Sequence, residues 1–119
     1  MMEKDVFICD DDKNIAEILG MIAEDVGASI AIETNSSLLF PRLKKCIPKL
    51  LIIDLWMPER SGEDIIRALR GEEVFQDLRI LCISASIDGQ QIARSAGADF
   101  YLAKPFDIYE VKALMNRVL

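Results

Sequence analysis

Histidine is missing altogether from this chain of 119 residues. Without it, no Ser-His-Asp or Cys-His nucleophile system can form, and no imidazole is present to bind a metal ion. The chain also cannot carry a phosphohistidine of its own. Phosphoryl transfer from a phosphohistidine would therefore require a donor on another protein.

Cysteine is scarce as well. Cys9, Cys46 and Cys82 are the only three, and they stand far apart in the sequence. Two of them lie in apolar runs, which argues against a disulfide framework or a zinc site. We expect reduced thiols that act as small core residues.

Long apolar runs are also absent. They stop well short of the roughly 18 residues that a membrane-spanning helix needs, and the acidic segment 1–5 does not resemble a signal peptide. The net charge is −6, with acidic and basic residues interleaved, so no basic stripe for nucleic acid is apparent. We expect a cytoplasmic protein that binds neither a membrane nor nucleic acid directly.

The composition, 51% hydrophobic and 29% charged, is typical of one globular domain spanning residues 1–119. Short β-branched runs alternate with amphipathic stretches, which predicts repeated strand-helix units and a parallel sheet. The expected strands are residues 6–9, 29–33, 50–53, 80–83 and 99–102. This alternation favours an α/β, doubly wound (βα)5 domain.

The expected helices fill the intervals between these strands. Apolar residues at helical spacing predict a first helix over residues 15–26. A second should cover residues 36–46, with Pro41 delaying its first turns. Ser61 and Asp107 each precede an acidic residue by three positions, the spacing of a capping box, and so mark the starts of the third and fifth helices. The fourth helix is expected over residues 89–96.

Five polar residues lie at or just past the carboxyl ends of the predicted strands: Asp10, Asp11, Asp54, Ser84 and Lys104. In a doubly wound sheet, ligands bind at this edge, where the strand order reverses. A carboxylate at the end of a buried strand is also costly unless something uses it. We therefore treat these residues as the candidate site.

The residue types indicate phosphoryl chemistry. Clustered carboxylates repel one another, and with oxygen ligands only, the natural counter-ion is Mg²⁺, with Mn²⁺ as an alternative. Asp54 is the candidate nucleophile for an aspartyl phosphate, and Asp10 and Asp11 are the candidate metal ligands. Lys104 would supply a positive charge to the phosphoryl oxygens, and the Ser84 hydroxyl a hydrogen bond.

Four motifs occur in the same order as in a known family and together span the chain: residues 7–12, residues 51–58 with Gly62, residues 83–85 and residues 96–106. They resemble the receiver domain of two-component response regulators, in the chemotaxis-regulator-like superfamily. The resemblance implies a flavodoxin-like fold whose five-stranded parallel sheet has the order 2-1-3-4-5.

The resemblance also implies roles for single residues. Asp54 would be the phosphoacceptor, and Mg²⁺ would bind Asp10, Asp11, Asp54 and the backbone carbonyl of Trp56. Ser84 and Tyr101 would form the switch pair. Ser84 would move toward the phosphoryl group while Tyr101 swings inward behind it.

The same resemblance implies the partners. A sensor histidine kinase or a histidine phosphotransfer protein would donate the phosphoryl group. A downstream effector would read the face made by the fourth helix, fifth strand and fifth helix, and a phosphorylation-dependent homodimer is a further implication. The chain would be a signalling module rather than an enzyme, catalysing only its own phosphotransfer and dephosphorylation. It would be either a stand-alone receiver or a piece of a longer regulator.

Three alternatives stay open. A flavodoxin-like FMN module shares the architecture, but it needs a Gly/Ser/Thr-rich phosphate cradle where this chain has aspartates. A haloacid-dehalogenase-like phosphatase would need a second acid at position 56, which is Trp56. A receiver-shaped scaffold could bind partners without phosphorylation.

Two departures from the family pattern are visible. Ser84 and Lys104 lie closer together in the sequence than the family pattern leads us to expect, so the fourth helix should be short or displaced. Trp56 places a large side chain two residues after the phosphoacceptor. We hypothesise that its bulk restricts attacking water and prolongs the aspartyl phosphate.

Overall fold

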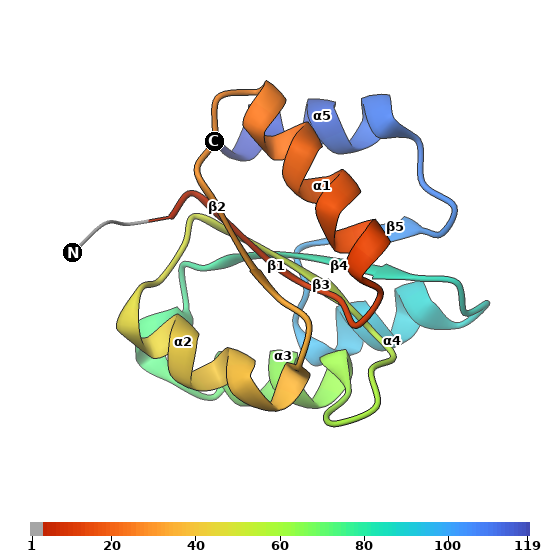
Figure 1. Ribbon diagram of the computed structural model, residues 1–119. Helices are drawn as coiled ribbons and strands as arrows, with labels where there is room; N and C mark the ends of the chain where they lie inside the picture. Colours follow the sequence, from red (N-terminus) through yellow and green to blue (C-terminus); the bar gives the residue numbers. More distant parts are fainter. Residues whose placement is uncertain (1–3) are drawn as a thin grey trace.

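The computed structural model describes residues 4–119. A five-stranded sheet forms its centre (Figure 1). The strands are β1 (Val6–Cys9), β2 (Ile30–Glu33), β3 (Leu50–Asp54), β4 (Arg79–Ser84) and β5 (Phe100–Ala103). They lie in the order β2-β1-β3-β4-β5, and every neighbouring pair is parallel. The expected fold and strand order are confirmed.

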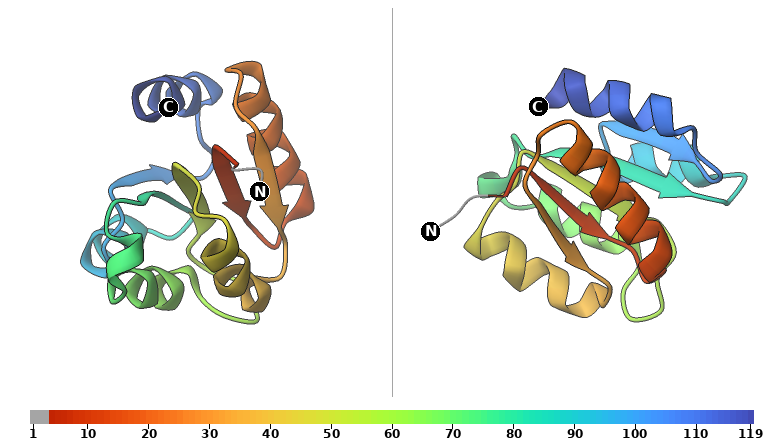
Figure 2. Two further views of the ribbon diagram at one scale, coloured as in Figure 1. Left: turned by 90° about the vertical axis from the view of Figure 1, so that its left-hand side faces the viewer. Right: turned by 45° about the horizontal axis from the view of Figure 1, so that its top comes forward.

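Helices cover both faces of this sheet. They are α1 (Lys13–Asp25), α2 (Leu39–Lys45), α3 (Gly62–Arg70), α4 (Gly89–Ala96) and α5 (Ile108–Val118), with short 3-10 turns η1 (Ser36–Leu38) and η2 (Glu73–Phe75). Helices α1 and α5 lie on one face, and α2, α3 and α4 lie on the other (Figures 1 and 2). The chain therefore winds in both directions from its first strand, as a doubly wound domain does.

The central strands are apolar without alternation because both of their faces are covered. Val6 and Ile8 of β1 point into the core beneath α1 and α5, whereas Phe7 and Cys9 point into the core on the other side. Cys9 and Cys82 are fully buried, and no disulfide joins any of the cysteines. Burial raises the pKa of both buried thiols to about 12, so these two act as core residues, as predicted.

Local sequence signals account for most of the helix boundaries. Asp12 caps α1, since its side chain accepts hydrogen bonds from two backbone N–H groups of the first turn. Ser61 caps α3 by accepting from the N–H of Asp64 at 3.1 Å. Asp107 caps α5, but its carboxylate accepts from the N–H of Tyr109 instead of Glu110.

The second and fourth helices also follow their predictions. The chain forms η1 first and enters α2 only at Leu39, so Pro41 falls in the first turn of the α-helix, where its missing N–H costs little. Helix α4 spans Gly89–Ala96 as expected and is only 8 residues long. Gly97 ends it with a φ of 119°, a conformation that favours glycine.

Strands β2 and β5 both begin one residue later than predicted, β2 at Ile30 rather than at Ser29. Strand β5 starts at Phe100, not at Asp99. The carboxylate of Asp99 accepts a hydrogen bond from the Ile80 N–H at 2.9 Å and another from the Arg70 guanidinium at 2.8 Å. Asp99 therefore ties the start of β4 to helix α3.

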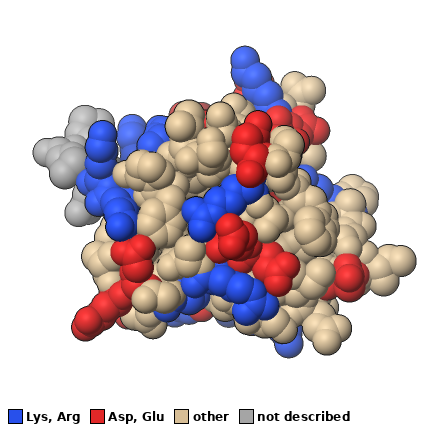
Figure 3. Space-filling model, turned by 90° about the horizontal axis from the view of Figure 1, so that it is seen from below, with Lys and Arg blue, Asp and Glu red and all other residues tan. Residues whose placement is uncertain are grey.

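The face formed by α2 and α3 carries both signs of charge (Figure 3). Basic and acidic side chains pair across it: Arg42 with Glu33, Lys44 with Glu72, Arg60 with Asp64 and Arg67 with Glu63.

Every helix within residues 4–119 is too short or too polar to cross a lipid bilayer.

Candidate functional site

Three carboxylates meet at the carboxyl edge of the sheet. Asp54 is the last residue of β3, and Asp10 directly follows β1, its neighbour in the sheet. Oxygen atoms of Asp10, Asp11 and Asp54 all lie within 4.8 Å of one another. Asp10 and Asp54 are buried, whereas Asp11 is exposed. The fold thus brings together the three acids that were predicted from the sequence, and Asp11 is the one that faces solvent.

Lys104 directly follows the edge strand β5 and reaches this cluster along the carboxyl edge of the sheet. Its Nζ donates a hydrogen bond to Asp10 Oδ2 at 3.0 Å and lies 3.4 Å from Asp54 Oδ1. The backbone N–H of Lys104 donates to the carbonyl oxygen of Ser84 at 2.8 Å, and the peptide bond to Pro105 is cis. One ammonium group therefore bridges the two buried acids.

Burial and mutual repulsion perturb these acids. Burial, followed by the negative charge of Asp10, raises the pKa of Asp54 to about 6, and Lys104 offsets only part of this effect. Burial also raises the pKa of Asp10. Burial alone would lower the pKa of Lys104, but its hydrogen bond to Asp10 and the charges of both buried acids raise it. The cluster has more negative charge than Lys104 balances.

The donor set fits a hard divalent cation. All three side chains offer carboxylate oxygens, and one of them is open to solvent, where a bound Mg²⁺ can retain several waters. One oxygen of Asp10 accepts from the N–H of Asp12 at 2.9 Å, which fixes the orientation of the carboxylate. Trp56 follows β3 by two residues, and its side chain is half exposed. Its backbone carbonyl as a fourth ligand stays a prediction.

The two residues predicted as a switch pair are in contact. Ser84 ends β4 and is fully buried, and its hydroxyl oxygen accepts a hydrogen bond from the N–H of Ser86 at 3.0 Å. Tyr101 lies on β5, half buried, and its hydroxyl donates to the carbonyl oxygen of Ser84 at 3.1 Å. Ser84 stands one residue beyond Ile83, which pairs with Asp54 in the sheet. The structure thus places Ser84 beside the strand end that carries Asp54, with Tyr101 bonded to Ser84.

Sequence reasoning included Gly62 in the motif after Asp54 but did not predict its close approach to the Asp54 backbone. The first carbon of a side chain at this position would collide with the backbone oxygen of Asp54. The N–H of Gly62 donates to the carbonyl oxygen of Leu55 at 2.8 Å, closing the loop that follows β3. The one available signal was a glycine shortly after Pro58 at the start of a helix. Gly62 allows α3 to begin directly beneath Asp54.

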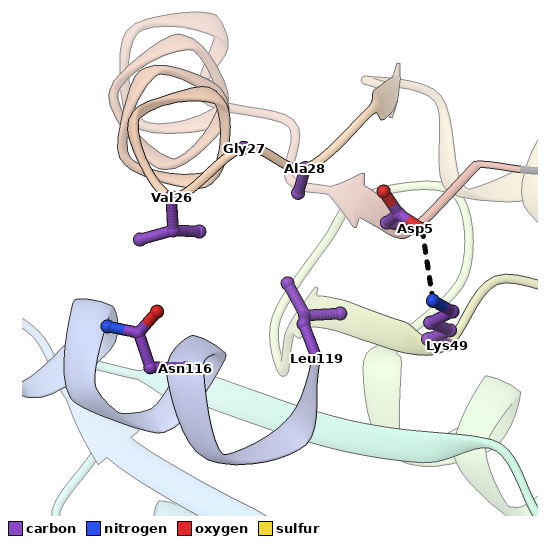
Figure 4. Close-up of a pocket in the computed structure, with 7 residues that line it drawn as sticks. All are labelled: Asp5, Val26, Gly27, Ala28, Lys49, Asn116 and Leu119. Atoms are coloured by element: carbon purple, nitrogen blue, oxygen red, sulfur yellow. Dashed lines mark ion pairs between the residues drawn. The ribbon is translucent and has the colours of Figure 1, made fainter.

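A separate cavity of about 210 Å³ lies at the opposite, amino end of the strands (Figure 4). It is lined by Asp5, Val26, Gly27, Ala28, Lys49, Asn116 and Leu119. Its one ion pair joins Lys49 to Asp5 at 3.6 Å. Because Asp5 and Lys49 precede β1 and β3, this cavity is not part of the acidic cluster.

Comparisons with known proteins agree with this geometry. The family model described as the response regulator receiver domain matches residues 6–116. An uncharacterised 14.6 kDa protein of Leptolyngbya boryana is 29% identical, the match covering 98% of this chain and 91% of that protein. Response regulator Rre1 of Synechocystis is 28% identical over 96% of this chain and 51% of its own length.

Solved structures show the same fold. The signal receiver domain of a signal transduction histidine kinase from Syntrophus aciditrophicus superimposes with a TM-score of 0.87 and 26% identity, covering 98% of this chain and 89% of that one. The chain spans about half the length of Rre1 and of several other curated relatives that it matches.

Proposed function

Since the chain belongs to the family of response regulator receiver domains of two-component systems, we propose that Asp54 accepts a phosphoryl group from a phosphohistidine on another protein, with Mg²⁺ as cofactor. One observation carries the proposal. Three carboxylates lie within 4.8 Å of one another, and a single lysine bridges the two buried ones. The absence of histidine from the chain agrees with a donor on a separate protein. With its family, we expect the chain to work in the cytoplasm.

Asp54 would act as the nucleophile. Its carboxylate oxygen attacks phosphorus, the bond between phosphorus and the donor's imidazole nitrogen breaks, and the imidazole leaves with the bonding electron pair. Asp10, Asp11, Asp54 and the carbonyl of Trp56 would hold Mg²⁺, which supplies positive charge to the phosphoryl oxygens and offsets the repulsion among the acids.

Lys104 and Ser84 would then stabilise the phosphorylated form. Lys104 already lies beside Asp54, so a small shift of its flexible side chain would bring the ammonium to a phosphoryl oxygen. The Ser84 hydroxyl oxygen accepts from Ser86, which leaves the hydroxyl proton able to donate to a phosphoryl oxygen. Hydrolysis of the aspartyl phosphate would return the domain to its starting state.

An apolar groove beside the site fits a protein donor. It has a volume of about 270 Å³ and is lined by Ile15, Ile18, Lys104, Pro105, Phe106 and Ile108. Ile18 and Ile108 are 44% and 53% exposed, so they offer apolar surface to a partner. Lys104 lines this groove and also contacts Asp10 and Asp54. A sensor kinase or phosphotransfer protein bound in the groove would therefore hold its phosphohistidine close to Asp54. An effector would read the α4-β5-α5 face, where Tyr109 is 79% exposed.

The decisive experiment is phosphorylation by a small donor. Incubation with Mg²⁺ and phosphoramidate should add one phosphoryl mass, and Asp54→Ala should abolish the adduct. Asp12→Asn is the matched control, because it removes a neighbouring carboxylate outside the cluster while keeping a good helix cap. It should be labelled like the wild type. If no Mg²⁺-dependent adduct forms on Asp54, the scaffold alternative is favoured, and absorbance after incubation with FMN tests the flavin alternative.

The docking groove can be tested separately. Ile18→Asp should slow transfer from a phosphorylated histidine phosphotransfer protein but leave labelling by phosphoramidate unchanged. Met21→Asp is the control, since Met21 is also exposed on α1, at 68%, but does not line the groove. Equal effects of the two substitutions on protein-mediated transfer would argue against docking at this groove.

A further inference from the structure

Gly89, the first residue of α4, is buried against the predicted switch pair. A methyl group at this position would lie 2.6 Å from the Tyr101 hydroxyl oxygen and 3.0 Å from both the Cβ and the hydroxyl oxygen of Ser84. Side-chain carbons do not pack as close as 2.6 Å to another heavy atom. A side chain at residue 89 would therefore force either the Tyr101 hydroxyl or the start of α4 to shift.

The helix is held at this place by the short connection from β4. The N–H of Gly89 donates to the carbonyl oxygen of Ser86 at 3.2 Å, and Ser86 also hydrogen-bonds Ser84 and Asp88. The segment between Ser84 and Gly89 thus forms a tight turn. Because the segment from Ser84 to Lys104 is short, the start of α4 lies directly over Ser84.

Tyr101 occupies the space that Gly89 leaves. It is half buried, packs against the core on the α3 and α4 side of the sheet, and donates to the Ser84 carbonyl. Tyr109, the only other tyrosine, is by contrast 79% exposed. The contacts that hold the Tyr101 ring inward thus come from Ser84, from the core and from the space at Gly89, and not from Asp54.

We propose that Gly89 is a positioning residue of the Ser84–Tyr101 pair, which allows Tyr101 to take its inward position before any phosphoryl group is bound. The role of Gly89 in signalling rests on the proposed function, but its effect on the position of the Tyr101 ring does not. Phosphorylation would then act on the output face mainly through Ser84, with little further movement of Tyr101.

The test uses ¹H–¹³C NMR of the two tyrosine rings in the unphosphorylated full chain, assigned with Tyr109→Phe. Gly89→Ala should move the Tyr101 ring signals toward those of exposed Tyr109 and lower the melting temperature, although alanine is ordinarily the better helix former. Gly71→Ala is the matched control. A methyl group there would meet its nearest atoms at 3.4 and 3.6 Å, so the Tyr101 signals should not change.

Combining Gly89→Ala with Tyr101→Phe separates positioning from general packing. Tyr101→Phe removes the oxygen closest to the new methyl group. Gly89→Ala should therefore lower the melting temperature of the Tyr101→Phe variant by less than half as much as it lowers that of the wild type. If Gly89→Ala alone does not fold, a folded double variant supports the proposal, and an unfolded one overturns it. Unchanged Tyr101 signals, or equal costs in both backgrounds, also overturn it.

Phosphorylation of the wild type provides the final comparison. With Mg²⁺ and phosphoramidate, the Tyr101 signals should move much less than they do in Gly89→Ala, and a larger displacement would overturn the proposal. Failure to form any adduct would contradict the proposed function of Asp54. It would leave the inward position of Tyr101, measured without phosphorylation, as a separate result.

Discussion

Replacing Asp54 by Asn should stabilise the fold when no divalent cation is present. The pKa of Asp54 rises from its ordinary 3.8 to about 6, chiefly because the group is buried and secondly because Asp10 is close. At about 1.4 kcal/mol per pKa unit, ionised Asp54 then costs at most about 3 kcal/mol at neutral pH. Asparagine has nearly the same shape and no charge, and Lys104 keeps Asp10 as its partner. We expect a gain of about 1–3 kcal/mol.

The pH dependence has a definite sign. A carboxyl group whose pKa is higher in the folded than in the unfolded state binds its proton more tightly when folded. The stability that it contributes is fully present below the unfolded pKa and is lost as pH rises through the folded pKa. For Asp54 this window runs from 3.8 to about 6. The advantage of Asn should therefore be largest above about pH 7 and fall to about 1 kcal/mol near pH 4.5.

Urea unfolding followed by far-ultraviolet circular dichroism, in EDTA, measures this directly. Mg²⁺ should narrow the difference, because a bound cation favours the ionised carboxylate and thus stabilises the wild type more than Asp54→Asn. Asp12→Asn, which removes an exposed acid, should change the free energy of unfolding little. The reasoning fails if Asp54→Asn is no more stable than the wild type at neutral pH, or if its advantage is as large in acid.

Further substitutions test other parts of the structure. Trp56→Asn should speed the loss of the phosphoryl mass several-fold, because attacking water gains access; an unchanged or slower decay would contradict a shielding role for the indole. Asp11→Asn should weaken Mg²⁺ binding, followed by the fluorescence of the single tryptophan, by about tenfold or more, since it removes one of few carboxylate ligands; an unchanged affinity would show that Asp11 is not a ligand. Arg70→Ala should lower the free energy of unfolding by about 2–3 kcal/mol, because Arg70 donates to two backbone carbonyls and to Asp99. The exposed Arg67→Ala should cost about 0.5 kcal/mol or less, and equal losses would refute this account of Arg70.

The order of the elements could be predicted because each depends on local patterns. Apolar runs on a buried parallel strand differ in period from an amphipathic helix, and a capping side chain acts within one turn. Strand β1 has the predicted bounds, and the other strands differ by a residue at one or both ends. Once the strands are parallel, their carboxyl ends share one edge, so the meeting of Asp10, Asp11 and Asp54 follows from the topology.

What depends on packing could not be predicted in this way. Asp99 was expected to open a strand, but its carboxylate is bound by Arg70, which lies 29 positions earlier in the sequence. The closeness of Gly62 to Asp54, and of Gly89 to Tyr101, is visible only once helices and strands are placed against each other. Such contacts join residues whose separation in the sequence carries no periodic signal.

The sequence alone determined which chemical groups stand at the sheet edge: oxygen ligands, one lysine, one hydroxyl and no imidazole. Only the tertiary structure decided how strongly they perturb one another. The pKa of Asp54 depends on burial and on the distances to Asp10 and Lys104, and the position of Tyr101 depends on the space beside Gly89. Desolvation and steric exclusion act through space, so they arise only when the whole chain has packed.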